Sequence, residues 1–408
     1  MLIAGCGKQE PAQTADGPAA ADVMTAEQAT QLQAEIKTFC GACHQVPAAE
    51  MFAQEAWYKE VNRGYDFYVD SGRNDLIPPP LAQVVDWYRQ RAPETLPRPE
   101  PLPSAPGDLR FQSQSIPTTD GAAPMIAEIL WDGELRLCDM ANGLVTGVDP
   151  NDIQPQAVCK VLNACRSRRI DLDGDSIPDL LVSDLGSRTP SDHTRGSLQF
   201  FSGQADASFA SEGVVLLDQI GRVVDCAPAD FDQIGDLDLI VVEFGWMKTG
   251  GIHLLENQCQ RDASGRLQME SGSFKVQRID PRHGAISVEI CDLNNDSFLD
   301  ALILFSQEFE TIDVFLGNGD LTFRRETVMP AQDPAFGSCS MDLADIDGDG
   351  DPDIVYCNGD TLDSMTVKHY HGVHLLRNNG LFPFDETRLL TMPGASDAVV
   401  ADLDNDGD

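Results

Sequence analysis

Basic residues are scarce in this 408-residue chain. It has 28 Lys and Arg against 66 Asp and Glu, which gives a formal net charge of −38. Because neutralising phosphates requires clustered Lys and Arg, this deficit excludes nucleic acid and an anionic lipid surface as direct partners. Long apolar runs are absent as well, since no stretch reaches the roughly 18 residues of a membrane-spanning helix. Hydrophobic residues still make up 42% of the chain, which is enough for a folded core.

Histidine is also rare, and one of the seven histidines directly follows a pair of cysteines, in Cys40-Gly-Ala-Cys43-His44. C-x-x-C-H is the attachment signature of c-type haem, in which two thiols bind the haem vinyl groups and the histidine binds the iron. A zinc site needs a second Cys/His pair nearby, but neither residue type occurs between His44 and Cys138. A thioredoxin-like dithiol would follow a strand, whereas residues 28–39 predict an amphipathic helix. The motif therefore predicts covalent haem c, with Cys40 and Cys43 as attachment points and His44 as the proximal iron ligand.

The chain start agrees with an exported protein, because covalent haem is attached outside the bacterial cytoplasm. Met1-Leu-Ile-Ala-Gly-Cys6 resembles a lipobox, so we expect Cys6 to be lipidated and residues 1–6 to be the remnant of a lipoprotein signal. The alternative is a chance apolar start. The charged and apolar parts of a signal are missing, and we expect the natural start to lie upstream. The predicted location is the periplasm or cell surface, with membrane contact only through the lipid, and some of the other cysteines are expected to pair.

Acidic residues gather in a repeated nonamer of the form D-h-D/N-x-D-x-x-x-D, where h is apolar. Copies begin at Asp171, Asp292 and Asp345, a weaker copy begins at Asp230, and a fifth begins at Asp402 and meets the chain end. The copies start roughly 50 to 60 residues apart, a period typical of propellers and other arrays of repeated units. Short apolar runs at 180–182, 239–242, 301–304 and 354–356 follow the nonamers and predict buried strands.

This pattern resembles FG-GAP/VCBS repeats, the calcium-loop blades also found in the integrin α-subunit propeller. The resemblance covers residues 118–408 and implies an all-β propeller of about five blades. Because the nonamer at Asp402 ends before its ninth residue, we expect the last blade to be truncated and the propeller to be incomplete. A propeller leaves no exposed sheet edges only when its last blade meets its first.

The spacing of the nonamer suits a calcium ion. Alternate residues of a tight loop point inward, so oxygens at positions 1, 3, 5 and 9 and a carbonyl at position 7 can surround one ion with the hard ligands that calcium prefers. The alternative is a solvated Asp-rich turn, and Ile234 at the fifth position weakens the Asp230 copy. The expected ligands are Asp171, Asp173, Asp175 and Asp179; Asp230, Asp232, Asp236 and Asp238; Asp292, Asn294, Asp296 and Asp300; Asp345, Asp347, Asp349 and Asp353; and Asp402, Asp404 and Asp406.

Residues 26–92 have the length and helix pattern of a minimal cytochrome c. Apolar residues recur along one face of the helix that carries the haem motif and again at residues 84–88. The arrangement resembles the short cytochrome at the front of bacterial secreted proteins that continue into FG-GAP/VCBS repeats. The sixth iron ligand stays open between Met51, Tyr65, Lys59 and an open site. Residues 7–25 predict a flexible tether. Residues 93–117 predict a Pro-rich linker, whose fourteen residues from Pro93 to Pro106 would form a stiff spacer of about 40 Å.

Two smaller sets of residues allow more than one interpretation. His369, His371 and His374 could bind a transition metal, but His253 holds the same place as His374 in another repeat, which favours a role in strand packing. Three cysteines precede their acidic loops and are either core residues or disulfide partners: Cys165, Cys226 and Cys339.

These observations predict a small all-α cytochrome c domain followed by a calcium-stabilised propeller, acting in electron transfer with a redox partner protein in the cell envelope. The main alternative is an adhesion or ligand-binding propeller, with a protein or polysaccharide ligand, in which haem is a redox sensor. A haem oxidoreductase is the weakest alternative, because residues 45–92 contain no His for a distal His/Arg pair. We therefore expect an electron carrier or binding protein rather than an enzyme.

Overall fold

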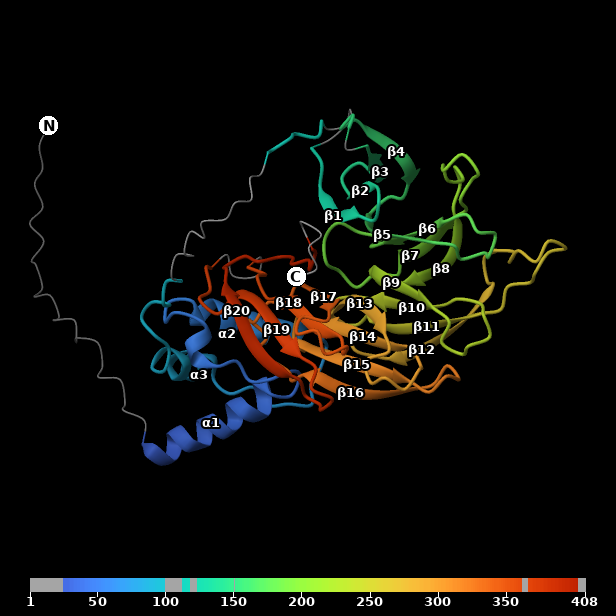
Figure 1. Ribbon diagram of the computed structural model, residues 1–408. Coiled ribbons are helices and arrows are strands. Elements are labelled where there is room, and N and C mark those ends of the chain that lie inside the picture. The colour runs from blue at the N-terminus through green and yellow to red at the C-terminus, as the bar shows by residue number, and fades with distance from the viewer. Residues whose placement is uncertain (1–24, 100–111, 118–122, 150, 362–365, 403–408) are drawn as a thin grey trace, which may run out of the picture.

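The computed structural model describes residues 25–99, 112–117, 123–149, 151–361 and 366–402 (Figure 1). Helices come first: α1 (Ala26–Cys40), the 3-10 turn η1 (Ala49–Met51), α2 (Trp57–Asp70) and α3 (Leu81–Arg89). The remaining described chain forms five four-stranded antiparallel sheets, each with its strands in sequence order. The expected all-β propeller is therefore confirmed, and each sheet is one blade.

The blades follow one another along the chain without exchange of strands. Blade one is β1 (Ile126–Trp131), β2 (Leu135–Asp139), β3 (Leu144–Val148) and β4 (Pro155–Lys160); blade two is β5 (Ala164–Ile170), β6 (Asp179–Asp184), β7 (Gly196–Phe201) and β8 (Val214–Ile220); blade three is β9 (Val223–Ala229), β10 (Asp238–Glu243), β11 (Gly251–Asn257) and β12 (Phe274–Asp280); blade four is β13 (Ala285–Cys291), β14 (Asp300–Phe305), β15 (Thr311–Gly317) and β16 (Phe323–Met329); and blade five is β17 (Ser340–Ala344), β18 (Asp353–Cys357), β19 (Gly372–Arg377) and β20 (Asp385–Thr391).

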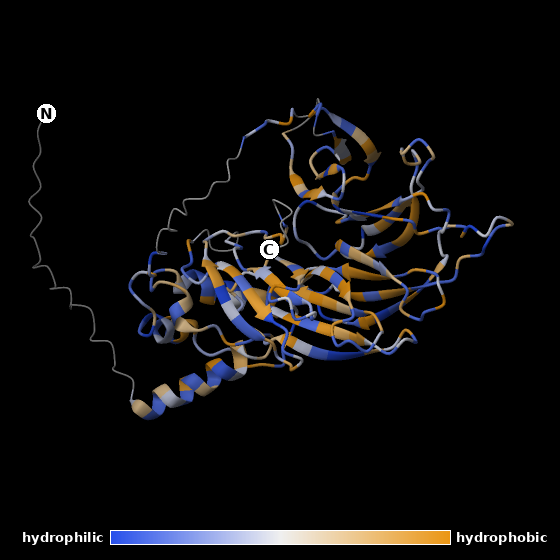
Figure 2. Ribbon diagram, in the orientation of Figure 1, coloured by the Kyte–Doolittle hydropathy of each residue, from blue (hydrophilic) through white to orange (hydrophobic). Residues whose placement is uncertain are grey.

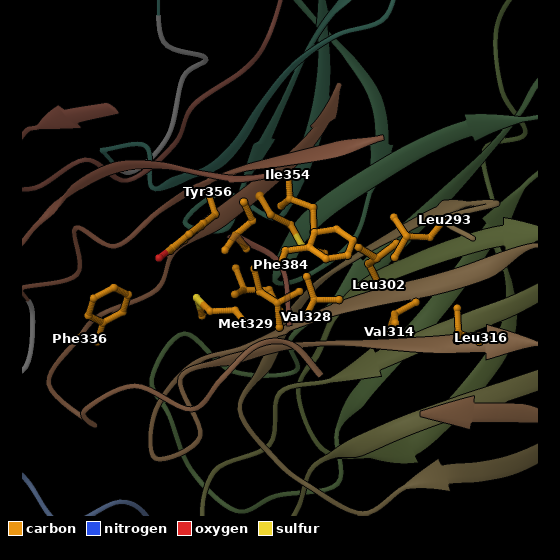
Figure 3. Packing of buried hydrophobic residues seen from close by; sticks show 14 residues of the cluster. Leu293, Leu302, Val314, Leu316, Val328, Met329, Phe336, Ile354, Tyr356 and Phe384 are labelled. Atoms are coloured by element: carbon orange, nitrogen blue, oxygen red, sulfur yellow. The ribbon is translucent and has the colours of Figure 1, made fainter. Parts of the chain in front are cut away.

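The second strand of blades two to five is the most buried part of each blade. Every residue of β6, β10, β14 and β18 is buried, so both faces of these strands are covered. The apolar runs that the sequence predicted as strands lie in these second strands. They appear in orange, the hydrophobic end of the scale, in the middle of the propeller (Figure 2). Between blades four and five, Leu302, Val314 and Ile354 pack in one cluster with Tyr356 and Phe384 (Figure 3). Burial of each such side chain contributes roughly 1.5–3 kcal/mol.

The expected number of about five blades is confirmed, but the placement of the blades along the chain corrects the sequence interpretation. Blade one has no acidic nonamer, because a short turn joins β1 directly to β2. Sequence periodicity therefore missed this blade and placed the fifth unit at Asp402 instead. The expectation that the last of five blades is truncated is wrong, since blade five has all four strands. The chain after β20 returns to the first strand of blade five, where the Val400 N–H donates to Asp342 Oδ2 (2.8 Å).

The first strands of successive blades contact one another and are joined by buried charges. Asp225 on β9 is fully buried and accepts hydrogen bonds from Arg166 (3.2 Å) and Arg168 (3.1 Å) of β5. It also accepts the Val288 N–H of β13 (3.1 Å), so one carboxylate connects blades two, three and four. Glu128 of β1 makes the equivalent bond to the Ser167 N–H of β5 (2.8 Å).

The helices pack around an aromatic core. Trp57 of α2 stacks on Tyr88 of α3 with ring centroids 3.9 Å apart, and Leu32 and Ile36 of α1 are buried in the same cluster. Thr25 caps α1 by accepting the Gln28 N–H in a capping box. The helices that the sequence predicted at 28–39 and 84–88 are confirmed as α1 and α3.

The helical part, residues 26–92, docks directly on the propeller. Asp333, in the connection between blades four and five, accepts the Ala48 N–H (2.7 Å), and Ala335 packs against the helical core. Lys368, before β19, lies 5.8 Å from the Phe52 ring. The two parts are therefore in direct contact. Residues 100–111 of the predicted Pro-rich linker lie outside the described residues.

We expect Asp225→Ala to lower the free energy of unfolding by about 3–5 kcal/mol, because it leaves Arg166 and Arg168 without their buried partner. Urea denaturation followed by circular dichroism measures the loss. Asp218→Ala, on the exposed side of β8, is the control and should change stability by less than about 0.5 kcal/mol. Equal effects of the two substitutions would show that the buried charges do not hold the blades together.

Candidate functional site

The acidic nonamers form four similar loops, each joining the first and second strands of a blade from two to five. In the first of them, Asp171 accepts the N–H groups of Gly174 (2.9 Å), Asp175 (3.1 Å) and Ser176 (2.8 Å). These bonds curl the backbone around the first carboxylate. Asp292 and Asp345 make the same pattern in blades four and five, so each nonamer folds through its own local bonds.

The ninth residue of each loop begins the second strand and is buried. Asp179 Oδ2 accepts the Leu172 N–H (2.9 Å), while its Oδ1 accepts the Gly203 N–H (2.8 Å) from beyond β7. Burial raises the pKa of Asp179, Asp238 and Asp300 to about 6. Water is excluded from these carboxylates, so their ionised form is disfavoured unless a positive charge lies beside them.

Two of the loops bring three carboxylates together. Oxygens of Asp171, Asp173 and Asp179 lie within 4.8 Å of one another, as do those of Asp345, Asp347 and Asp353. Such clusters could bind a metal such as calcium, because hard oxygen ligands suit hard cations. Asp175 and Asp349 belong to the same loops but lie outside these clusters.

The other loops do not assemble a three-acid cluster in the described part of the chain. In blade three, Ile234 is 69% exposed at the fifth position, and one oxygen of the buried Asp238 has no hydrogen-bond partner among the described residues. Asp230 and Asp232 there accept backbone N–H groups, and Asp236 pairs with Arg261. In blade four, the Asn294 side-chain N–H donates to the Asp296 carboxylate (2.9 Å), and the Asn294 side-chain oxygen accepts the Asp296 backbone N–H (3.0 Å). Asp402 is exposed after blade five, and Asp404 and Asp406 lie outside the described residues.

Some arginines contact the acidic loops, and the sequence analysis did not predict these contacts. Arg266, from the connection between β11 and β12, reaches across to blade two and donates to Asp173 (2.5 Å). Arg377, at the end of β19, pairs with Asp347 (2.5 Å). These pairs join residues far apart in sequence, so no local signal identified them.

The C-x-x-C-H motif lies at the end of α1, where the helix meets the propeller. Cys40 is the last helical residue and is half-buried, and burial raises the pKa of its thiol to about 11. Cys43 is exposed, and its sulfur accepts a hydrogen bond from Arg73 (3.0 Å). Nδ1 of His44 lies 2.7 Å from the Gln45 carbonyl oxygen. That bond places the ring proton on Nδ1 and leaves the Nε2 lone pair free for a metal.

The three side chains considered for the sixth iron ligand lie in different environments. Met51 ends η1 and packs in the helical core. The Tyr65 hydroxyl donates to the Pro79 carbonyl (2.6 Å), and burial raises its pKa, which disfavours the phenolate form that binds iron. Lys59 is exposed on α2.

The histidine and cysteine alternatives are resolved for the described residues. His374 on β19 bonds Asn358 (3.1 Å) and His253 on β11 bonds Glu243 (2.8 Å), which supports the equivalent packing role. His369 and His371 form no three-ligand metal group with His374 in this part of the chain. The ten described cysteines are all free, so the expectation of disulfides is not borne out there. Cys165 and Cys226 are buried core residues, and Cys339 is half-buried.

Comparison with known proteins identifies one segment. A family model described as an FG-GAP-like repeat matches residues 292–356, which span the acidic loops of blades four and five. The chain carries an FG-GAP-like repeat on a five-bladed β-propeller. No curated protein matches the chain. Among the described residues, no helix is long and apolar enough to cross a membrane.

We expect calcium to bind the FG-GAP-like loops and Asp347→Ala to remove one calcium per chain in isothermal titration calorimetry. Asp351→Ala, in the same loop, is the control, because the seventh position offers its carbonyl and the Asp351 side chain accepts a hydrogen bond from Asn295 (2.7 Å). Calcium at 100 times its dissociation constant adds about 2.7 kcal/mol per site, so the melting temperature should fall with chelator. The same calcium count for both variants would identify the loop as a solvated turn.

In chelator, we expect the free energy of unfolding to fall between about pH 4 and pH 6. The folded-state pKa of Asp179, Asp238 and Asp300 is about 6, above the ordinary value of 3.8, so the native state binds protons that the unfolded state releases. That stabilisation is present at low pH and is lost as the pH passes 6. Asp238→Asn should make the decline shallower, and Asp218→Asn should leave it unchanged. The midpoint of urea denaturation, measured at several pH values in this range, tests the prediction. The same slope of midpoint against pH in the wild type, Asp238→Asn and Asp218→Asn would contradict it.

Proposed function

We propose that the chain is an exported electron-transfer protein that carries covalent haem c on its helical part and uses the propeller as a docking scaffold. The single observation that carries the proposal is the C-x-x-C-H motif at the end of α1, with the His44 Nδ1 bonded to a carbonyl. This is the orientation in which a metal-ligating histidine is held. A redox partner protein in the cell envelope is the partner of this function.

The donor set fits the group. Cys40 faces the helical core and Cys43 faces solvent, so two thioethers would place a haem along the boundary between protein and water. The Tyr88 hydroxyl is buried beside Cys40 and has no hydrogen-bond partner among the described residues, which leaves a donor for a polar edge of the ligand. When bound, haem supplies one-electron redox chemistry at its iron.

The chain's own residues have distinct roles in this proposal. Cys40 and Cys43 hold the group covalently, and His44 Nε2 binds the iron while the Gln45 carbonyl orients the ring. The acidic loops hold calcium and fix the first and second strands of their blades. This keeps the propeller rigid beside the helical part, because ligand that binds only the native state stabilises it. Cys6 anchors the chain to the membrane through lipid, so the protein faces the periplasm or the outside.

A ligand-binding propeller is the second candidate, and an open groove of about 840 Å³ between blades three and four favours it. Lys275 and Arg278 of β12 line one side, and Asp320 and Phe323 near β16 line the other. Charged and aromatic side chains together suit a protein or polysaccharide ligand. In that case the haem would act as a redox sensor.

We expect haem to remain with the wild-type protein through denaturing electrophoresis, and Cys40→Ala combined with Cys43→Ala to abolish the haem-stained band. Cys259→Ala, a half-buried propeller cysteine, is the control and should keep full staining. The readout is peroxidase-type haem staining after expression with the bacterial haem attachment system. An unstained wild-type band would remove the proposed electron-transfer function, whereas carbon monoxide difference spectra of the loaded protein report whether the sixth position is filled.

A further inference from the structure

Arg222 is a buried arginine without a partner. It lies between β8 and β9 (Figure 1) and is 8% exposed. Its Nε is buried without a hydrogen-bond partner, and its guanidinium makes no ion pair with the described part of the chain. The fully buried Arg136, by contrast, pairs with Asp132 (2.5 Å). An unpaired buried charge destabilises a fold, so Arg222 points to an anionic partner that is not part of the chain.

The blade framework does not require an arginine at this position. In blades two, three and four, the residue just before the first strand accepts a backbone N–H from the residue just after the second strand. The accepting residues are Asn163 (3.2 Å), Arg222 (2.8 Å) and Gly284 (2.8 Å). These three equivalent residues differ in size and charge, while the backbone bond is the same. The guanidinium of Arg222 is therefore an addition of blade three to a common framework.

The carboxylates at this end of the blades are engaged by other donors. Glu243 accepts two backbone N–H groups and pairs with His253 (2.8 Å). Asp192 accepts the three successive N–H groups of residues 247–249. The acidic loops join the opposite ends of the same strands, which lie roughly 20 Å away for strands of six or seven residues. Within the described chain, no carboxylate therefore compensates the charge of Arg222.

The surroundings of Arg222 leave one edge of its guanidinium open. The centre of the Phe244 ring lies 5.2 Å from its Cζ. Nε is the one nitrogen of this side chain that is both buried and unpartnered, so the terminal N–H groups reach solvent. A carboxylate that approaches from this edge can accept two parallel hydrogen bonds.

A second arginine and a neutral histidine lie beside this edge, in the connection between β6 and β7. Burial, followed by the charges of Arg195 and Arg222, lowers the pKa of His193. Its Nδ1 accepts the Arg195 N–H (3.0 Å), so its Nε2 donates to the Ser187 hydroxyl (2.7 Å). The Arg195 side chain bonds a backbone carbonyl (3.1 Å) and, among the described residues, no carboxylate. Two guanidinium groups without acidic partners thus lie near one neutral ring.

We propose that Arg222, with Arg195 beside it, binds the carboxylate group of a small ligand at this end of blades two and three. A singly charged group is favoured, because the chain carries a formal net charge of −38 and repels an anion more strongly as its charge rises. The site is independent of the proposed haem and of the calcium loops. It adds a small-molecule site to the docking role proposed for the propeller.

The test measures the thermal denaturation midpoint of the full-length protein in sodium acetate, sodium sulfate and sodium chloride at equal ionic strength. Acetate should raise the wild-type midpoint a few degrees above its value in chloride, because ligand that binds only the native state stabilises it. Arg222→Met keeps the side-chain stem and should abolish this rise. Arg324→Met, which removes an exposed arginine that pairs with Glu326 on β16, is the control and should keep it.

Arg222→Met should also be at least as stable as the wild type in chloride, since it removes an unpaired buried charge. Arg222→Lys tests the geometry, because an ammonium keeps the charge but loses the parallel N–H pair. Line broadening of ¹³C-labelled acetate in nuclear magnetic resonance should be clear for the wild type and several-fold weaker for Arg222→Lys. The same acetate-dependent rise in the wild type and Arg222→Met, or no broadening by the wild type, would overturn the site. A larger Arg222-dependent rise in sulfate than in acetate would overturn the assignment to a carboxylate.

Discussion

The propeller depends on the buried carboxylate of Asp225. It is fully buried and joins two arginines of blade two to a backbone N–H of blade four, so three consecutive blades share one charge. A buried carboxylate needs positive charges and hydrogen-bond donors around it, because desolvation of an unpaired charge costs several kcal/mol. A simpler contact of the same kind joins blades one and two, where Glu128 accepts the Ser167 N–H. Apolar packing fills the space between blades, but these charges fix how the first strands are placed.

In the acidic loops, by contrast, the carboxylates are not fully paired with positive charges. Their carboxylates are held close together by backbone N–H groups, and only part of the charge is neutralised by arginines such as Arg266 and Arg377. The buried ninth position of three loops has a pKa raised to about 6 by burial. An arrangement that concentrates ionised oxygens in this way is stable at neutral pH when a cation shares them. This links the stability of the blades to the ions around the protein.

The junction between the helical part and the propeller is where the two halves of the proposed function meet. Asp333 and Lys368 reach the helical residues from the propeller, and His44 faces blade four. The helical part and the propeller therefore pack directly against each other.

The sequence by itself determined the local features of this protein. The spacing of the nonamers fixed the acidic loops, because Asp171 and its equivalents bond N–H groups within five residues, and the apolar runs after them fixed the buried second strands. The C-x-x-C-H motif and the helix before it were equally local. Only the tertiary structure decided the existence of blade one, which has no acidic loop, and the partners of Asp225, Ala48 and Asp173. Those partners lie tens to hundreds of residues away along the chain. The periodicity of the sequence does not indicate which distant group a buried carboxylate will bind in the folded protein.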